Sequence, residues 1–119
     1  MKKDADFHTY IMNDLLANIP GVTSRAMFGG WGIYQKGIIF AIIADGELYF
    51  KVDETNKKDF EECDMRPFMY TMPNGKQMAM AYWQLPEEIM ENSEELEVWV
   101  SKSVEVSLRG KKSKPKSKQ

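Results

Sequence analysis

The chain has 119 residues, of which 43% are hydrophobic and 29% charged, and this length and composition indicate one globular domain and exclude a disordered chain. Its one cysteine, Cys63, excludes an internal disulfide and favours a reducing, cytoplasmic compartment. No apolar run approaches the ~20 residues that cross a bilayer, and the acidic residues after Met1–Lys3 argue against a secretion signal. We therefore expect no membrane partner.

The net charge of −2 is unevenly distributed. The segment 109–119 contains six basic and no acidic side chains, namely Arg109, Lys111, Lys112, Lys114, Lys116 and Lys118. The segment 1–108 therefore has a net charge of −8, which repels a phosphate backbone. We expect residues 1–108 to form the domain and residues 109–119 to be a disordered basic tail, through which any nucleic-acid contact would be made.

An amphipathic helix is predicted over residues 6–19. Its apolar side chains recur at helical spacing: Phe7, Tyr10, Ile11, Leu15 and Ile19. Pro20-Gly21 is expected to end the helix.

The centre of the chain, residues 25–52, predicts an antiparallel sheet. Strands are expected near 24–28, 31–35, 38–44 and 47–52, with two-residue turns at Asp45-Gly46 and, less strongly, at Lys36-Gly37. Opposed residues share a face, so one predicted face comprises Tyr34, Ile39, Ala41, Ile43, Leu48, Phe50 and Val52. The other comprises Trp31, Ile33, Phe40, Ile42, Tyr49 and Lys51. Because both faces are apolar, we expect helices on both sides, or helices on one side and a second subunit on the other.

The second half of the chain predicts two further helices around a second hairpin. Thr55 is expected to cap a short helix over about 55–63. The predicted hairpin joins residues 68–72 to 77–83 around Asn74-Gly75 and leaves room for a packed helix, because it sets Phe68 against Ala81 and Tyr70 against Ala79.

A terminal helix is predicted over about 94–108, capped by Ser93 and ended by Gly110. Its apolar stripe contains Leu96, Trp99, Val100, Ser103, Val104, Ser107 and Leu108. The predicted fold is α+β, an antiparallel sheet of about five to six strands with N-terminal and C-terminal helices packed on it.

The sequence contains no catalytic, cofactor-binding or metal-binding constellation that we recognise. The glycines of Gly29–Gly32 lack the Lys-Ser/Thr and helix start of a phosphate-binding loop, so they indicate a bulge or positive φ. His8 has no second histidine or nucleophile near it in sequence. The acids beside Cys63 are expected to raise the pKa of its thiol, and the acidic run 87–97 indicates a solvated helix face. We therefore expect no enzyme activity and no cofactor.

The candidate interaction surface comprises Arg25, Trp31, Phe40, Tyr49, Lys51, Tyr70 and Tyr82. The aromatic residues Trp31, Phe40 and Tyr49 are consistent with core under a helix, with a dimer or partner surface, or with a platform that stacks bases. The net negative charge of residues 1–108 argues against binding of nucleic-acid bases. The cations Arg25 and Lys51 either pack their stems and keep their charges in water or bind an acidic partner.

Several linked motifs resemble those of the TfoX (Sxy) N-terminal domain family of bacterial competence regulators. The stretch Arg25–Tyr34 resembles the family's opening motif, and further matches follow in order at Gly37, Phe40-Ala41, Leu48–Lys51, Pro67–Tyr70, Met80–Trp83, Leu85–Glu88, Glu94–Leu96 and Trp99. The resemblance covers nearly the whole chain except its first residues and the tail. It implies a small α+β domain with no known enzyme activity. Full-length regulators add a C-terminal helical domain and are thought to act with a cyclic-AMP-responsive transcription activator at DNA, so this chain resembles a stand-alone N-terminal domain.

We therefore expect a non-enzymatic regulatory or interaction domain that contacts a protein partner or a second copy of itself. One alternative is a nucleic-acid-binding accessory protein that acts through the tail lysines, Lys111, Lys112, Lys114, Lys116 and Lys118. Another is a small-ligand-binding domain with a pocket near Arg25, Lys51, Tyr70 and Tyr82.

Overall fold

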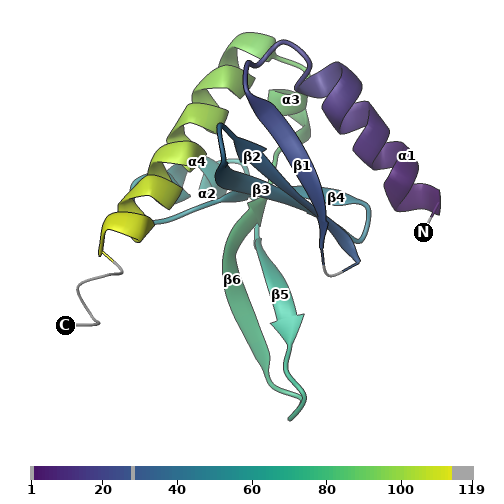
Figure 1. The fold of residues 1–119 in the computed structure, drawn as a ribbon. Helices are drawn as coiled ribbons and strands as arrows, with labels where there is room; N and C mark the ends of the chain where they lie inside the picture. Colours follow the sequence, from purple (N-terminus) through teal and green to yellow (C-terminus); the bar gives the residue numbers. More distant parts are fainter. Residues whose placement is uncertain (1, 28, 114–119) are drawn as a thin grey trace.

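The computed structural model describes residues 2–27 and 29–113. It contains a six-stranded antiparallel sheet with the strand order β1-β2-β3-β4-β6-β5 and helices from both ends of the chain (Figure 1). The elements are α1 (Lys2–Tyr10), the π-helical turn η1 (Ile11–Leu15), β1 (Val22–Met27), β2 (Gly30–Gln35), β3 (Ile38–Ala44), β4 (Glu47–Lys51), α2 (Lys57–Glu61), β5 (Pro67–Thr71), β6 (Gln77–Gln84), α3 (Glu87–Met90) and α4 (Ser93–Ser113). The predicted α+β class and strand number are confirmed.

The first helix differs from the predicted 6–19 at both ends. The α-helix ends at Tyr10 and continues as η1, in which the Leu16 N–H donates to the carbonyl of Ile11, five residues earlier, at 2.9 Å. A π-helical turn is wider than an α-turn, so Ile11 and Leu16 lie one turn apart and both are buried. Tyr10, expected on the apolar stripe, is instead 43% exposed.

The two central turns form as predicted. Lys36, Gly37, Asp45 and Gly46 all have positive φ, and the pairs Gln35–Ile38 and Ala44–Glu47 flank two-residue loops. Positive φ at both central residues is the type I′ geometry, whose twist matches that of the flanking strands.

A bulge between β2 and β3 overturns part of the predicted face assignment. Tyr34 pairs with Ile39, but Ile33 pairs with Ala41, so Phe40 is an extra residue on β3. Phe40 is fully buried and meets Phe50 edge-to-face at 5.5 Å. The bulge places Trp31, Ile33 and Phe40 on the inner face, the face that the helices cover, with Ala41, Ile43, Leu48 and Phe50. The opposite, outer face carries Arg25, Met27, Gly32, Tyr34, Ile39, Ile42, Tyr49, Lys51 and Tyr82.

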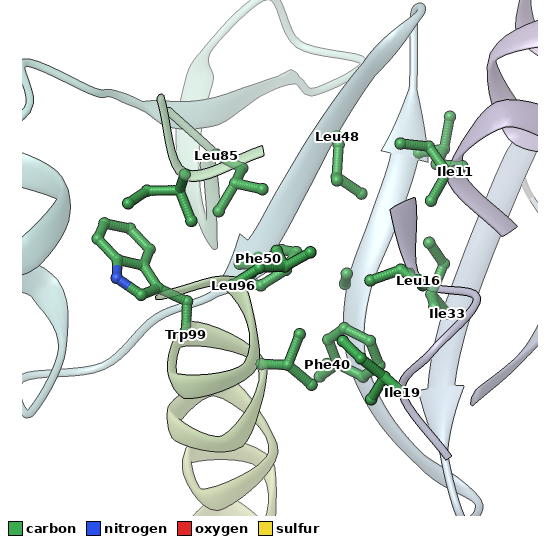
Figure 2. Close-up of a cluster of buried hydrophobic side chains, with 14 of the residues drawn as sticks. Ile11, Leu16, Ile19, Ile33, Phe40, Leu48, Phe50, Leu85, Leu96 and Trp99 are labelled. Carbon is green, nitrogen blue, oxygen red and sulfur yellow. The ribbon is translucent and has the colours of Figure 1, made fainter. Parts of the chain in front are cut away.

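The core lies between the inner face and the helical segments (Figure 2). The sheet contributes Ile33, Phe40, Leu48 and Phe50, the N-terminal segment contributes Ile11, Leu16 and Ile19, and α4 contributes Leu96, Trp99 and Val100. The hydroxyl of Ser103 donates to the Lys51 carbonyl at 2.9 Å, and that of Ser107 donates to the Ile39 carbonyl. Both serines are buried, and these bonds fix α4 on β3 and β4.

The terminal helix is longer than predicted. Gly110 does not end it, because α4 continues to Ser113 and Gly110 lacks the positive φ of a helix-ending glycine. Arg109, part of the predicted tail, lies in α4 and forms an ion pair with Asp53 at 3.3 Å. The predicted disorder of residues 114–119 lies outside the described residues.

The short helix α2 begins later than predicted, at Lys57. Thr55 does not cap it, since its N–H and hydroxyl both donate to Asp53. Phe60 of α2 faces the core, and its side chain is 1% exposed.

The second hairpin, which we call the arm (residues 67–84, β5 and β6), extends away from the helices (Figure 1). Its predicted register is wrong by one residue. The Met72 N–H donates to the Lys76 carbonyl and Gly75 has a φ of 90°, so the loop has three residues. Tyr70 therefore pairs with Met78 rather than with Ala79. The expectation that a helix packs against this hairpin is also wrong, since Met69 to Thr71 and Gln77 to Ala81 are exposed.

Candidate functional site

An apolar hollow lies between the sheet and the arm. Its volume is about 550 Å³. It is lined by residues without formal charge, namely Met27, Gly30, Trp31, Ile42, Ile43, Ala44, Phe68, Tyr70, Met80 and Tyr82. The sheet forms one wall and the arm forms the other, because β6 joins the sheet only at its C-terminal end, where Tyr82 to Gln84 pair with β4.

The arm exposes an unusual amount of apolar surface beside this hollow. Tyr70 is 50% exposed, Met78 51%, Met69 45% and Met80 38%. Tyr70 and Met78 are directly opposed across the two strands and therefore share a face. The arm and the hollow together form what we call the docking surface.

Trp31 is covered on one side by the first helix. Its indole stacks on the imidazole of His8, with ring centroids 4.3 Å apart and planes 9° from parallel. His8 Nε2 lies 2.8 Å from the Ser24 hydroxyl oxygen on β1. Burial lowers the pKa of His8, so the neutral imidazole is favoured and serves as a packing group between α1 and the sheet.

Tyr49 is half-buried on the outer face. Its ring meets Phe68 of the arm at 4.9 Å in an edge-to-face arrangement. Burial, together with the charges of Glu47 and Asp45, raises the pKa of Tyr49. The chain's own arm therefore shields part of the apolar outer face.

Lys51 and Tyr82 form a second contact at the base of the arm. The Lys51 ammonium lies 5.0 Å from the centroid of the Tyr82 ring, within the range of a cation–π interaction. Burial, and to a lesser extent the neighbouring Tyr34, raises the pKa of Tyr82 to about 12. Tyr82 is therefore neutral at physiological pH.

The structure brings most of the predicted surface residues together. Trp31, Tyr70 and Tyr82 line the hollow, and Tyr49 and Lys51 adjoin it through Phe68 and Tyr82. Arg25 is exposed on the outer face of β1, two residues before Met27.

Phe40 does not belong to this surface. Its side chain is fully buried, because the bulge turns it toward the helices. The sequence prediction also missed the other seven lining residues, namely Met27, Gly30, Ile42, Ile43, Ala44, Phe68 and Met80. One available signal is the methionine content, since five of the nine methionines lie within residues 65–80.

The thiol of Cys63 lies beside acidic side chains, which do not activate it. The Cys63 sulfur lies 3.9 Å from a Glu88 carboxylate oxygen. Burial, then the charges of Glu88 and its acidic neighbours, raises the pKa of the Cys63 thiol, as predicted, although Glu88 itself was not anticipated. A raised pKa lowers the thiolate fraction at neutral pH.

Within residues 2–27 and 29–113, no cluster of three or more histidine, cysteine or acidic side chains has the geometry to hold a metal ion. In the same part of the chain, no helix combines the length and the apolar character that crossing a bilayer requires. The side chains of Lys111, Lys112, Lys114, Lys116 and Lys118, which carry the nucleic-acid prediction, lie outside the described residues.

Comparison with known proteins adds one finding. A family model described as the TfoX N-terminal domain matches residues 14–107. This match spans every strand and most of the helical residues of the fold described above. No curated protein matches the chain.

Proposed function

The chain belongs to the TfoX N-terminal domain family, and from that premise we propose that it is a non-enzymatic regulatory domain that binds a protein partner through the docking surface. Membership of this family suggests a regulatory domain of the competence and transcription-regulator type. The proposal adds the mode of action, which is recognition of another protein by the arm and the hollow.

One observation carries the proposal, namely the exposed apolar arm. Monomeric soluble proteins rarely keep large contiguous apolar patches in water, and such patches commonly mark interaction sites. Here four large apolar side chains are at least 38% exposed on one two-stranded element. Beside them is a hollow lined by aromatic and methionine side chains.

The residue types support a protein partner. Tyrosine, tryptophan, phenylalanine and methionine are enriched where proteins meet. Methionine also adapts its shape to a partner because it is unbranched and has three rotatable bonds. The pair Met78 and Met80 lies on the face that Tyr70 and Tyr82 occupy.

The test uses two matched substitutions. Tyr70→Glu places a carboxylate on the docking surface, whereas Val98→Glu places one on α4 at a side chain of nearly equal exposure, 49% against 50%. We expect a protein from a cell extract to be retained by the immobilised wild-type chain and by Val98→Glu but not by Tyr70→Glu. The purified partner should then reproduce this ranking in a direct binding measurement. Equal retention by both variants would contradict the proposal.

A small apolar ligand is the second candidate, favoured by the volume of the hollow. About 550 Å³ lies within the range of roughly 300–1,000 Å³ that small-molecule pockets occupy. In that case a compound extracted from the purified chain should be displaced by filling the hollow with Ala44→Phe. A chain that carries no extractable compound favours the protein partner.

A further inference from the structure

We propose that the segment that occupies the docking surface is acidic and carries large apolar side chains. This inference rests on the proposed function and specifies the chemistry of the partner. It follows from where the charges of this chain lie.

The arm has no carboxylate of its own. Residues 65–86 contain two cations, Arg66 and Lys76, and no acidic residue, although Asp64 and Glu87 lie immediately outside this segment. This contrasts with the net charge of −8 that residues 1–108 carry. A basic, apolar element therefore projects from an acidic body.

The outer face beside the arm adds two further cations. Arg25 is exposed on β1, and Lys51 lies over the Tyr82 ring at the base of the arm. The acids whose charges act on Tyr49 of this face are Glu47 and Asp45, which add to burial in raising its pKa. Glu47 accepts a hydrogen bond from the Gln84 side chain at 2.7 Å. The lining of the hollow itself contains no acid.

Six of the chain's 18 acidic residues cluster at the other end of the molecule. Six glutamates lie on α3, at the start of α4 or between the two helices: Glu87, Glu88, Glu91, Glu94, Glu95 and Glu97. In Figure 1 α3 lies at the end of the molecule opposite the arm. An acidic ligand is therefore steered away from this end and toward the cations around the hollow.

A second copy of the chain fits this surface less well. A two-fold contact of one docking surface on another would bring Arg25, Lys51 and Lys76 of one copy toward the same cations of its partner, and like charges across an interface are unfavourable. The acidic end of a second copy offers carboxylates, but the large apolar side chains exposed near it among the described residues are only Tyr10 and Val98. An acidic segment of another protein with its own apolar anchors satisfies both requirements.

The probe is a pair of synthetic peptides of roughly 18 residues, about five helical turns. One carries leucines at amphipathic helical spacing with glutamate at the other positions, and its twin carries lysine at every glutamate position. We expect the acidic peptide to bind the intact chain at least about tenfold more tightly than the basic twin, with an affinity that falls when salt is raised.

Two substitution pairs locate the binding. Met80→Glu places a carboxylate in the hollow and should abolish binding of the acidic peptide, whereas Val98→Glu should leave it unchanged. Arg25→Glu should weaken binding by about threefold to tenfold, whereas Lys58→Glu, an exposed cation on α2, should have a smaller effect. Circular dichroism confirms that each variant is folded.

Equal binding of both peptides, lost in Met80→Glu, would overturn the charge inference while supporting the docking surface. A wild-type dimer that binds neither peptide and that Met80→Glu converts to a monomer would identify a second copy as the occupant and would likewise overturn the inference alone. Binding of the acidic peptide that Met80→Glu does not change would place it elsewhere and overturn the inference. A monomer that binds neither peptide overturns the inference, and the retention experiment with Tyr70→Glu then decides the proposed function separately.

Discussion

The hairpins β3–β4 and β5–β6 have similar turn and strand patterns in the sequence, but in the structure the first is largely buried and the second largely exposed. Each contains an Asx-Gly pair between apolar strands. In β3–β4 the pair forms a two-residue turn, and Phe40, Ala41, Ile43, Leu48 and Phe50 are buried. In β5–β6 the loop has three residues, and most of the strand residues are exposed.

The difference comes from the neighbours of each hairpin. β3 and β4 have strands on both sides, and α4 is fixed on them by the buried hydroxyls of Ser103 and Ser107. The outer half of the arm pairs only with itself, since the hydrogen bond from the Val52 N–H to Ala81 is the outermost one from the sheet to β6 among the described residues. Apolar residues in a strand therefore indicate a surface that is unfavourable in water. The tertiary arrangement decides whether other parts of the same chain bury that surface.

The largest expected contrast is between Phe50→Ala and Tyr70→Ala. Phe50 is fully buried, so its truncation should lower the free energy of unfolding by about 3–5 kcal/mol. Tyr70 is half exposed, so its truncation should change that free energy by about 0.5 kcal/mol or less. Chemical denaturation of both variants measures the contrast, and a large loss in Tyr70→Ala would mean that the arm packs on the body in solution.

An intermediate contrast is expected between the turn glycines. Gly46 has a φ of 75° and Gly75 a φ of 90°, so alanine at either position costs about 1–2 kcal/mol of backbone strain. Gly46→Ala should lower global stability by this amount, whereas Gly75→Ala should mainly lower the hydrogen-exchange protection of arm amides, because the arm opens locally. A matching drop in protection of β3 and β4 in Gly75→Ala would show that the arm unfolds with the core.

The smallest expected effect is a loss of folding stability at high pH, caused by ionisation of Tyr82 at the base of the arm. The pKa of Tyr82 is raised from 10.0 to about 12, so the protonated phenol is favoured in the folded state. Its contribution to stability is complete below about pH 10 and is lost as the pH rises toward 12. Tyr82→Phe, which cannot ionise, should lose less stability than the wild type between pH 9 and pH 11. Identical losses, measured by urea denaturation, would show that the base of the arm is solvated.

The sequence was sufficient to predict the strands, the two tight turns that prove to be type I′, and the apolar stripe of α4. These features depend on local signals, because glycine at the second position of both turns takes positive φ readily, as does the aspartate of Asp45-Gly46, and an apolar repeat of three and four residues defines one helix face. The family motifs were also readable, because they occur in order along nearly the whole chain.

The candidate site was only partly predictable. Of the predicted surface residues, the structure brings Trp31, Tyr49, Lys51, Tyr70 and Tyr82 together at or beside the hollow. Phe40 was misplaced because one extra residue at the bulge changes the face of every residue beyond it.

By itself the sequence determined an antiparallel sheet that is apolar on both faces, since residue type and spacing report which side chains avoid water. Only the tertiary structure decided which part of that surface stays open. The bulge at Phe40, the π-helical turn at Ile11 and the three-residue loop at Gly75 each shift register by about one residue. Such shifts depend on the packing of segments far apart in the chain, and no local pattern specifies them.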